Sequence, residues 1–302
     1  MRLVNSVTDL IGGTPIVRLN RLPGSDRAEV WVKLEYFNPS RSIKDRAAYS
    51  MISQAEVDGL IQPGAIIIEP TSGNTGLGLA MVAAAKGYRL ILTMPDNMTA
   101  ERINIIRAFG AQVVLTPASE KMPGAIKKAE ELREQNRGSI ILQQFVNKAN
   151  PEIHRITTAK EIFQQVNGKL DAFVATAGTG GTITGAGEVL KELIPGCKIC
   201  VVEPEGSPVL SGGEPGRHNI PGTSPGFIPQ VLNTKVYDEI FLISDTDALQ
   251  TSQELATKEG ILVGISAGAA VHTALKVAKA LGPGKKVVAI APDTGERYLS
   301  LL

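Results

Sequence analysis

Short apolar runs alternate with amphipathic segments over nearly the whole chain, and this alternation constrains the fold more than any other feature. Most runs are continuous and rich in β-branched residues, which is typical of parallel strands buried on both faces. Strands are predicted at Val30–Leu34, Ala65–Glu69, Leu90–Met94, Gln112–Leu115, Ile140–Gln143, Ala172–Thr176, Ile199–Val202, Glu239–Ile243 and Val287–Ile290. Helices are predicted at Thr75–Lys86, Ala125–Asn136, Thr182–Leu193, Thr246–Lys258 and Ala267–Leu281. Repeated strand–helix units indicate an α/β fold with mostly parallel sheets wound on both sides.

The chain length indicates two such domains. With 302 residues, the chain is about twice the common single-domain size. The polar stretch NKANP at 147–151 is the best candidate boundary. We therefore expect one α/β domain over residues 1–149 and a second over residues 150–302.

Charge and composition exclude several classes of partner. The chain carries 31 basic and 30 acidic residues with the signs interspersed, so nucleic acid is a poor candidate. Neither a signal peptide nor a run of membrane-span length is visible, which favours a cytoplasmic protein without a membrane partner. The two cysteines, Cys197 and Cys200, form a lone CxxC, and no metal-ligand pattern accompanies them. We expect inert, buried thiols on opposite faces of a strand.

Lys44 stands in the segment NPSRSIKDR, where a helix is expected to begin. An ammonium ion in the first helical turn faces the positive end of the helix dipole, which is unfavourable. That position favours the neutral amine that a Schiff-base lysine needs. The alternative is an ordinary surface lysine at a helix start.

Two glycine-containing segments each follow a predicted strand and open a predicted helix. TSGNTGLG at 71–78 offers hydroxyls and an amide that suit a carboxylate, and GTGGTITG at 178–185 suits a phosphate. A third segment, GISAGAA at 264–270, places Ser266 at the start of the last long helix. Each segment alone could be a tight turn or a helix cap.

A dinucleotide site is the competing interpretation of residues 178–185. An acid, Glu203, follows at about the expected distance of ~20 residues. However, the spacing is GxGGxxxG rather than GxGxxG, and this interpretation explains none of the other segments. A Walker-type loop is excluded because no Gly-Lys-Ser or Gly-Lys-Thr follows the glycines.

Together, these segments resemble the fold-type II pyridoxal-phosphate enzymes (tryptophan synthase β-like), and most closely the cysteine synthases, or O-acetylserine sulfhydrylases. The resemblance runs from about Asn5 to Ser300 and includes IGGTPIVRL, the QQF at 143–145 and PGFIP at 225–229. It implies pyridoxal 5'-phosphate as cofactor and a homodimer. It also raises serine acetyltransferase as a possible partner.

The resemblance also implies a role for each matching residue. Lys44 would carry the cofactor and move the α-proton, Asn74 would bind the ring hydroxyl, and Ser266 would face the pyridine nitrogen. The substrate carboxylate would be held by Thr71, Ser72, Thr75 and Gln144. The cofactor phosphate would be held by Gly178, Thr179, Gly180, Gly181 and Thr182. No metal is expected.

The implied reaction is β-replacement, which converts O-acetyl-L-serine and sulfide into L-cysteine and acetate through an aminoacrylate. Relatives that deaminate usually carry a histidine after the asparagine, where this chain has Thr75. A cystathionine β-synthase using homocysteine and a thiosulfate-using cysteine synthase remain alternatives, with an NAD-dependent oxidoreductase a distant one. The Gly- and Pro-rich stretch Ser207–Gln230 is expected to be a mobile loop over the site.

Overall fold

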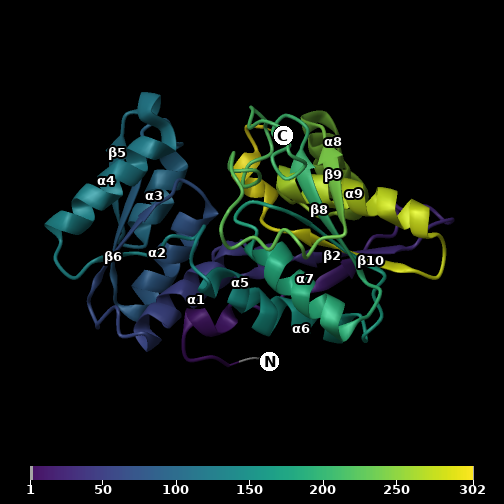
Figure 1. The fold of residues 1–302 in the computed structure, drawn as a ribbon, viewed down its shortest axis with the longest axis horizontal. Coiled ribbons are helices and arrows are strands. Elements are labelled where there is room, and N and C mark those ends of the chain that lie inside the picture. The colour runs from purple at the N-terminus through teal and green to yellow at the C-terminus, as the bar shows by residue number, and fades with distance from the viewer. Residues whose placement is uncertain (1–2, 302) are drawn as a thin grey trace. The chain divides into compact units, whose positions relative to one another are not determined.

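The computed structural model describes residues 3–301 and contains two compact units (Figure 1). The first unit holds Lys44–Ala149 together with the described residues up to Ile11. The second holds Gly12–Ile43 and the chain from Asn150 onward. The expected division at 149/150 places residues 12–43 in the N-terminal part, whereas these residues pack with the second unit.

The sheet of the first unit is fully parallel, with strand order β5-β4-β3-β6. Its strands are β3 (Ile66–Pro70), β4 (Arg89–Pro95), β5 (Gln112–Thr116) and β6 (Ile140–Ile141). Its helices are α1 (Lys44–Val57), α2 (Asn74–Lys86), α3 (Ala100–Ala108) and α4 (Lys121–Gln135). Ile67 packs with α1 and α2, while its neighbour Ile68 packs with Ala129 of α4. Both faces of the sheet are therefore covered, as continuous apolar strands require.

The second unit has a six-stranded sheet with order β1-β2-β10-β7-β8-β9, in which β1 is antiparallel to β2 and the other pairs are parallel. Its strands are β1 (Ile16–Arg18), β2 (Glu29–Leu34), β7 (Ala172–Thr176), β8 (Lys198–Pro204), β9 (Glu239–Ile243) and β10 (Lys286–Ala291). Its helices are α5 (Ala149–Ile153), α6 (Ala159–Gln165), α7 (Gly181–Leu193), α8 (Asp245–Glu259) and α9 (Ile265–Leu281). A π-helical turn, η4 (His154–Thr158), joins α5 to α6.

The two faces of this sheet also bury separate clusters. Val174 packs on the side of α8 and α9, and its neighbour Phe173 packs on the side of α6 and α7. The expected α/β fold with mostly parallel, doubly wound sheets is confirmed. No helix within residues 3–301 combines the length and apolarity needed to cross a membrane.

Candidate functional site

Lys44 is the first residue of α1, so the helix start expected there is confirmed. The residue is half-buried, and its first turn packs against α2. A Cβ on Gly78 would lie 3.1 Å from the Lys44 carbonyl oxygen and 3.2 Å from the Ala48 Cβ, so glycine permits this close helix crossing. The TSGNTGLG segment therefore both opens α2 and makes room for the Lys44 turn.

The loop Thr71–Gly73 connects the carboxyl end of β3 to α2, whose first residues are Asn74 and Thr75. The Thr71 N–H donates to the Thr93 carbonyl oxygen at 3.1 Å, and Arg102 Nη1 donates to the Ser72 carbonyl oxygen at 3.0 Å. The cap residue of α2 is Gly73, and no side chain caps the helix start. The loop is thus held at both sides, and the start of α2 has the character of an anion site.

Gln144 and Thr75, which the family resemblance assigns to one substrate subsite, are in contact. The Thr75 hydroxyl donates to Gln144 Oε1 at 2.6 Å, and both residues are buried. Two of the four residues expected to hold the carboxylate are therefore brought together within the first unit.

Glu69 fixes the segment that carries Gln144, and sequence reasoning did not identify it. Its carboxylate accepts hydrogen bonds from the backbone N–H groups of Leu142 at 3.0 Å, Gln143 at 3.0 Å and Gln144 at 3.2 Å. Gln143 has a φ of 59°, which a strand does not allow. The expected strand Ile140–Gln143 is therefore wrong beyond Ile141, because a carboxylate rather than a neighbouring strand satisfies these N–H groups.

Burial raises the pKa of Glu69, and the hydrogen bonds from the three N–H groups lower it. The effect of burial is larger, so the pKa rises to about 7. A charged residue inside the apolar run AIIIEP was the signal that could have marked it, since buried acids are rare unless they have partners.

The loop Gly178–Gly181 connects β7 to α7. Gly180 has a φ of 82°, and a Cβ there would also lie 2.7 Å from Leu232 Cβ. A Cβ on Gly178 would lie 2.2 Å from the Gly222 carbonyl oxygen. No side chain caps the start of α7, so the loop combines close backbone packing with the N–H groups of a helix start. These features fit a phosphate cradle.

The irregular stretch Ser207–Gln230 lies against this loop. Besides the Gly222 approach to Gly178, the Ser224 N–H donates to the Ala177 carbonyl oxygen at 2.9 Å. Its expected mobility stays a prediction.

Ser266 is the second residue of α9, so its expected place at a helix start is confirmed. The residue is only 5% exposed. Its hydroxyl stands in the first turn of a helix, a place that fits a ligand-binding role.

Three features from the sequence do not belong to this site. Glu203, the acid of the dinucleotide interpretation, accepts from the N–H groups of Leu210 at 2.7 Å and Ser211 at 2.9 Å, which commits it to the loop. Cys197 and Cys200 lie in hydrophobic clusters on opposite sides of the sheet. Burial raises the pKa of each thiol to about 12, so both are inert thiols, as expected.

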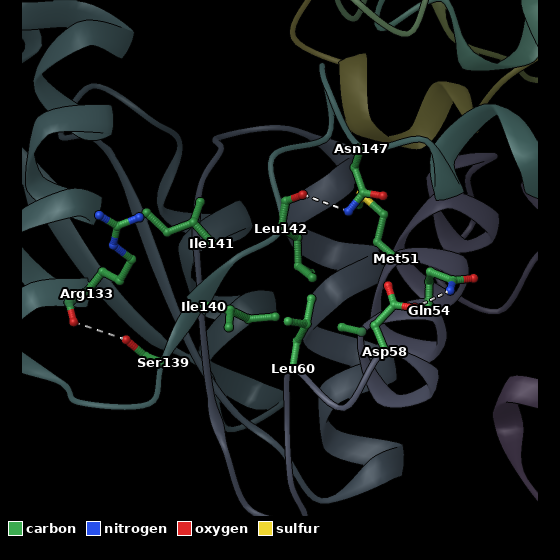
Figure 2. A pocket seen from close by; sticks show the side chains of 11 residues that line it. Met51, Gln54, Asp58, Leu60, Arg133, Ser139, Ile140, Ile141, Leu142 and Asn147 are labelled. Atoms are coloured by element: carbon green, nitrogen blue, oxygen red, sulfur yellow. Dashed lines mark hydrogen bonds between the residues drawn. The ribbon is translucent and has the colours of Figure 1, made fainter.

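Figure 2 shows a pocket of about 290 Å³ in the first unit, lined by residues of α1, α4 and β6 such as Met51, Arg133 and Ile140. None of the expected site residues is among the side chains that line it. We do not assign the chemistry to this pocket.

The model of the pyridoxal-phosphate dependent enzyme family matches residues 7–293. The chain therefore belongs to this family, and its cofactor is pyridoxal phosphate. The dinucleotide interpretation is thereby set aside.

Within the family, the close relatives are cysteine synthases. The chain is 61% identical to a probable cysteine synthase of Bacillus subtilis, over 99% of this chain and 97% of that protein. It is 54% identical to the cysteine synthase of Staphylococcus aureus, over 98% of this chain and 96% of that protein. The expected resemblance is confirmed.

Solved structures agree on the fold and differ in the named activity. A hydrogen sulfide-producing enzyme of Fusobacterium nucleatum has a TM-score of 0.95 and 45% identity, over 99% of both chains. An O-ureido-L-serine synthase has a TM-score of 0.96 and 46% identity, over 100% of this chain and 95% of that one. O-acetylserine sulfhydrylase isoform 3 of Entamoeba histolytica has a TM-score of 0.95 and 42% identity, over 99% of this chain and 91% of that one.

The residues of this chain fit the cofactor. The loop Gly178–Gly181 offers a glycine cradle and a helix start for a phosphate. Ser266 offers a hydroxyl in the first turn of α9, on a residue that is only 5% exposed, for a polar ring atom. Lys44 offers an amine in the first turn of a helix.

Proposed function

We propose that the chain is a cysteine synthase, which converts O-acetyl-L-serine and sulfide into L-cysteine and acetate. The observation that carries this proposal is the 61% identity to a probable cysteine synthase over nearly the full length of both proteins. The substrate-side geometry supports it, because the start of α2 with Thr75 and Gln144 suits the carboxylate of an amino acid.

Pyridoxal phosphate, when bound, supplies an electron sink for the charge that develops at the α-carbon of the amino acid. Lys44 binds the cofactor through its amine and moves the α-proton. Asn74 binds the ring hydroxyl, and Gly178, Thr179, Gly180, Gly181 and Thr182 hold the phosphate.

Ser266 faces the pyridine nitrogen in this proposal. A neutral hydroxyl does not hold a proton on that nitrogen as a carboxylate would, so the sink is moderate. A moderate sink suits loss of acetate from the β-carbon followed by addition of a sulfur nucleophile.

Thr71, Ser72, Thr75 and Gln144 hold the substrate carboxylate. Because Thr71 to Gly73 form a loop, binding of the carboxylate can order that loop and exclude water from the reacting carbon. Water would otherwise compete with sulfide and release pyruvate.

A second candidate is β-replacement with another nucleophile. Solved structures at 45–46% identity include an O-ureido-L-serine synthase and a hydrogen sulfide-producing enzyme, so one fold accommodates more than one named activity. Homocysteine and thiosulfate are the alternatives that the sequence motifs leave open.

Product analysis tests the proposal. The purified protein is incubated with O-acetylserine or serine, each with sulfide, thiosulfate or homocysteine, and the products are measured by mass spectrometry. Cysteine and acetate from O-acetylserine and sulfide, at the highest kcat/KM of the set, are expected. Faster cystathionine or S-sulfocysteine formation would overturn the choice of nucleophile. The homodimer, the cytoplasmic location and docking of serine acetyltransferase stay proposals.

A further inference from the structure

We propose that Asn150, His154 and Thr158 form a positioning layer beneath the phosphate loop. In this layer, the three side chains orient the hydroxyls of Thr179 and Thr182 so that both donate hydrogen bonds to the cofactor phosphate. The inference rests on the proposed phosphate-binding role of that loop. None of the three residues stands in a glycine-containing motif.

Close packing brings this layer to the loop. A Cβ on Gly181 would lie 2.1 Å from Asn150 Oδ1, and a Cβ on Gly185 would lie 2.0 Å from the Pro151 carbonyl oxygen and 2.9 Å from His154 Cβ. Glycines at both positions therefore allow α7 to pack directly on the segment from Asn150 to Thr158.

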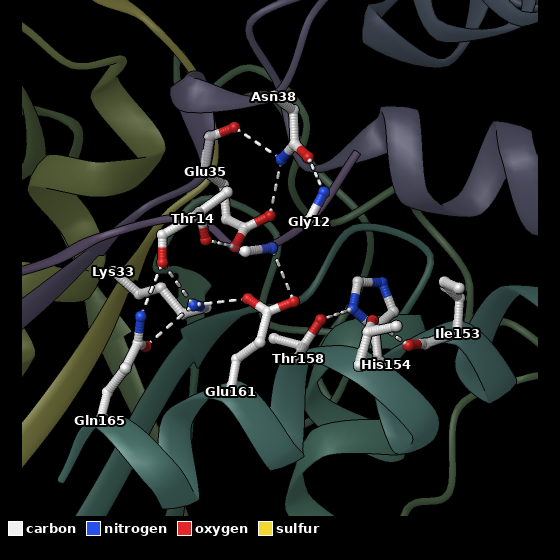
Figure 3. A network of polar contacts seen from close by, with 12 residues as sticks. Gly12, Thr14, Lys33, Glu35, Asn38, Ile153, His154, Thr158, Glu161 and Gln165 are labelled. Carbon is white, nitrogen blue, oxygen red and sulfur yellow. Dashed lines mark hydrogen bonds and ion pairs between the residues drawn. The ribbon is translucent and has the colours of Figure 1, made fainter. Parts of the chain in front are cut away.

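The segment is also held from the other side. In Figure 3, the ammonium of Lys33 lies against Glu161 of α6 at 2.8 Å, and the Gly13 N–H donates to the same carboxylate at 3.0 Å. Lys33 is fully buried. The π-helical turn η4 lies directly before this anchored helix, and such turns are frequent at functional sites.

Thr179 has its acceptor capacity occupied. Its Oγ1 accepts from Asn150 Nδ2 at 3.0 Å and from the Gly181 N–H at 3.4 Å. A hydroxyl has two lone pairs and one O–H group. With both lone pairs engaged, the Thr179 hydroxyl can act toward a further ligand only as a donor.

A histidine engages one of the two lone pairs of the Thr182 hydroxyl. His154 Nε2 lies 3.3 Å from Thr182 Oγ1, and His154 Nδ1 lies 2.9 Å from Thr158 Oγ1 (Figure 3 shows the second contact). Thr158 is fully buried, and within residues 3–301 its hydroxyl makes one hydrogen bond, to Nδ1. A buried O–H group without an acceptor is unfavourable, so Thr158 donates and Nδ1 accepts.

The tautomer of His154 follows from this assignment. An imidazole that accepts at Nδ1 carries its proton on Nε2, and that N–H donates to Thr182 Oγ1. The Thr182 O–H is then directed away from the histidine as a donor. A phosphate dianion accepts hydrogen bonds and does not donate them, so the O–H groups of Thr179 and Thr182, turned away from their protein donors, match it.

Nitrogen-15 NMR of the holoenzyme with labelled histidine tests the tautomer directly. The chain has three histidines, and His154→Gln identifies the signals of His154. We expect a protonated Nε2 and an unprotonated Nδ1 in the neutral imidazole. A protonated Nδ1 in the wild-type holoenzyme would overturn the inference, whatever the variants do.

Thr158→Val removes the hydroxyl and keeps the shape, so His154 should lose its tautomer preference. The phosphorus-31 signal of the bound cofactor should shift, and the cofactor should dissociate about fivefold faster, as expected for one neutral hydrogen bond. Asn150→Ala should have a similar effect through Thr179, and Thr158→Ser should restore the wild-type values.

Thr251→Val is the matched control, because Thr251 is also a buried threonine whose hydroxyl contacts a histidine Nδ1, that of His272 at 3.1 Å. It should leave the phosphorus-31 signal and cofactor release unchanged. Equal effects of Thr158→Val and Thr251→Val would contradict the positioning role. A wild-type protein that binds no pyridoxal phosphate would instead refute the proposed function itself.

Discussion

The hydroxyl of Thr75 donates a 2.6 Å hydrogen bond to the side-chain oxygen of Gln144. This contact fixes which way the planar amide points, with its oxygen toward Thr75 and its nitrogen toward the opposite side. Because the Thr75 hydroxyl already donates to Gln144, its contribution to an anion comes from the backbone N–H at the start of α2.

The Thr75–Gln144 pair should therefore act as a unit in amino-acid binding. Gln144→Ala should weaken binding of an unreactive amino acid by about 1.5–3 kcal/mol, the range for a hydrogen bond to a charged group. Thr75→Val should cost less, and the double variant should show coupling of about 0.5 kcal/mol or more. Spectral titration of the holoenzyme measures these affinities.

Gln143→Ala is the control for this pair, since its side chain belongs to the same segment but is not assigned to the substrate. Pyruvate formation relative to cysteine formation should rise for Gln144→Ala and stay constant for the control. Unchanged affinity together with unchanged pyruvate formation in Gln144→Ala would place the carboxylate subsite elsewhere.

Lys44→Ala should abolish covalent attachment of the cofactor while leaving phosphate-loop contacts to retain it. Turnover should fall by several orders of magnitude, since general-base help alone contributes roughly 10²–10⁴-fold. Borohydride reduction followed by peptide mass spectrometry should label Lys44 in the wild type. Lys128→Ala, a change at a surface lysine paired with Glu131, should label and turn over normally. Normal turnover of Lys44→Ala would refute the assignment.

Glu69 should make stability depend on pH. Its pKa rises from an ordinary value of 4.5 to about 7 in the folded chain, so the folded state binds the proton more tightly than the unfolded state does. The free energy of unfolding should therefore fall as pH rises through this window, by up to about 1.4 kcal/mol per pH unit.

Carbon-13 NMR of the Glu69 carboxyl gives the midpoint of this titration. Urea unfolding at pH 5 and pH 8 then compares the wild type with Glu69→Gln, which cannot titrate. The stability of the wild type relative to the variant should decline between the two pH values. A midpoint near 4.5 would show that the three N–H groups cancel the effect of burial, and it would contradict this prediction.

Ser266→Ala should leave much of the cofactor bound, because the phosphate contacts dominate anchoring, and should slow loss of acetate. Ser266→Asp should hold a proton on the pyridine nitrogen, which nitrogen-15 NMR of labelled cofactor detects. Ser252→Ala is a control at a buried serine that donates to the Val263 carbonyl oxygen. If both Ser266 variants keep the wild-type nitrogen shift and rate, Ser266 has no role at the ring.

The apolar pattern along the sequence predicted several strands well. The range Ala172–Thr176 matches the interior strand β7, because a buried parallel strand is a continuous apolar run. The range Glu239–Ile243 matches the edge strand β9. The same logic located the helix starts at Lys44 and Ser266, since turn residues and glycines precede them.

Nonlocal partners account for what local pattern did not predict. Gln143 has strand-like neighbours in sequence, yet its backbone N–H donates a hydrogen bond to the side chain of Glu69, which is distant in sequence. The short strand β1 (Ile16–Arg18) exists because β2 pairs with it. His154 and Thr158 are brought to the phosphate loop because their segment packs against α7. The spacing of residues along the chain does not reveal this packing.

The pairing of β2 with β10 has a consequence for how the chain is made. Residues 29–34 leave the ribosome long before their parallel neighbour, residues 286–291, is synthesised. Contacts of the first unit lie mostly within Lys44–Ala149, so they can form while synthesis continues. Until β10 arrives, β2 has β1 on one edge and an unpaired edge on the other. An unpaired apolar strand edge invites aggregation, so the nascent chain is most prone to aggregate during this interval.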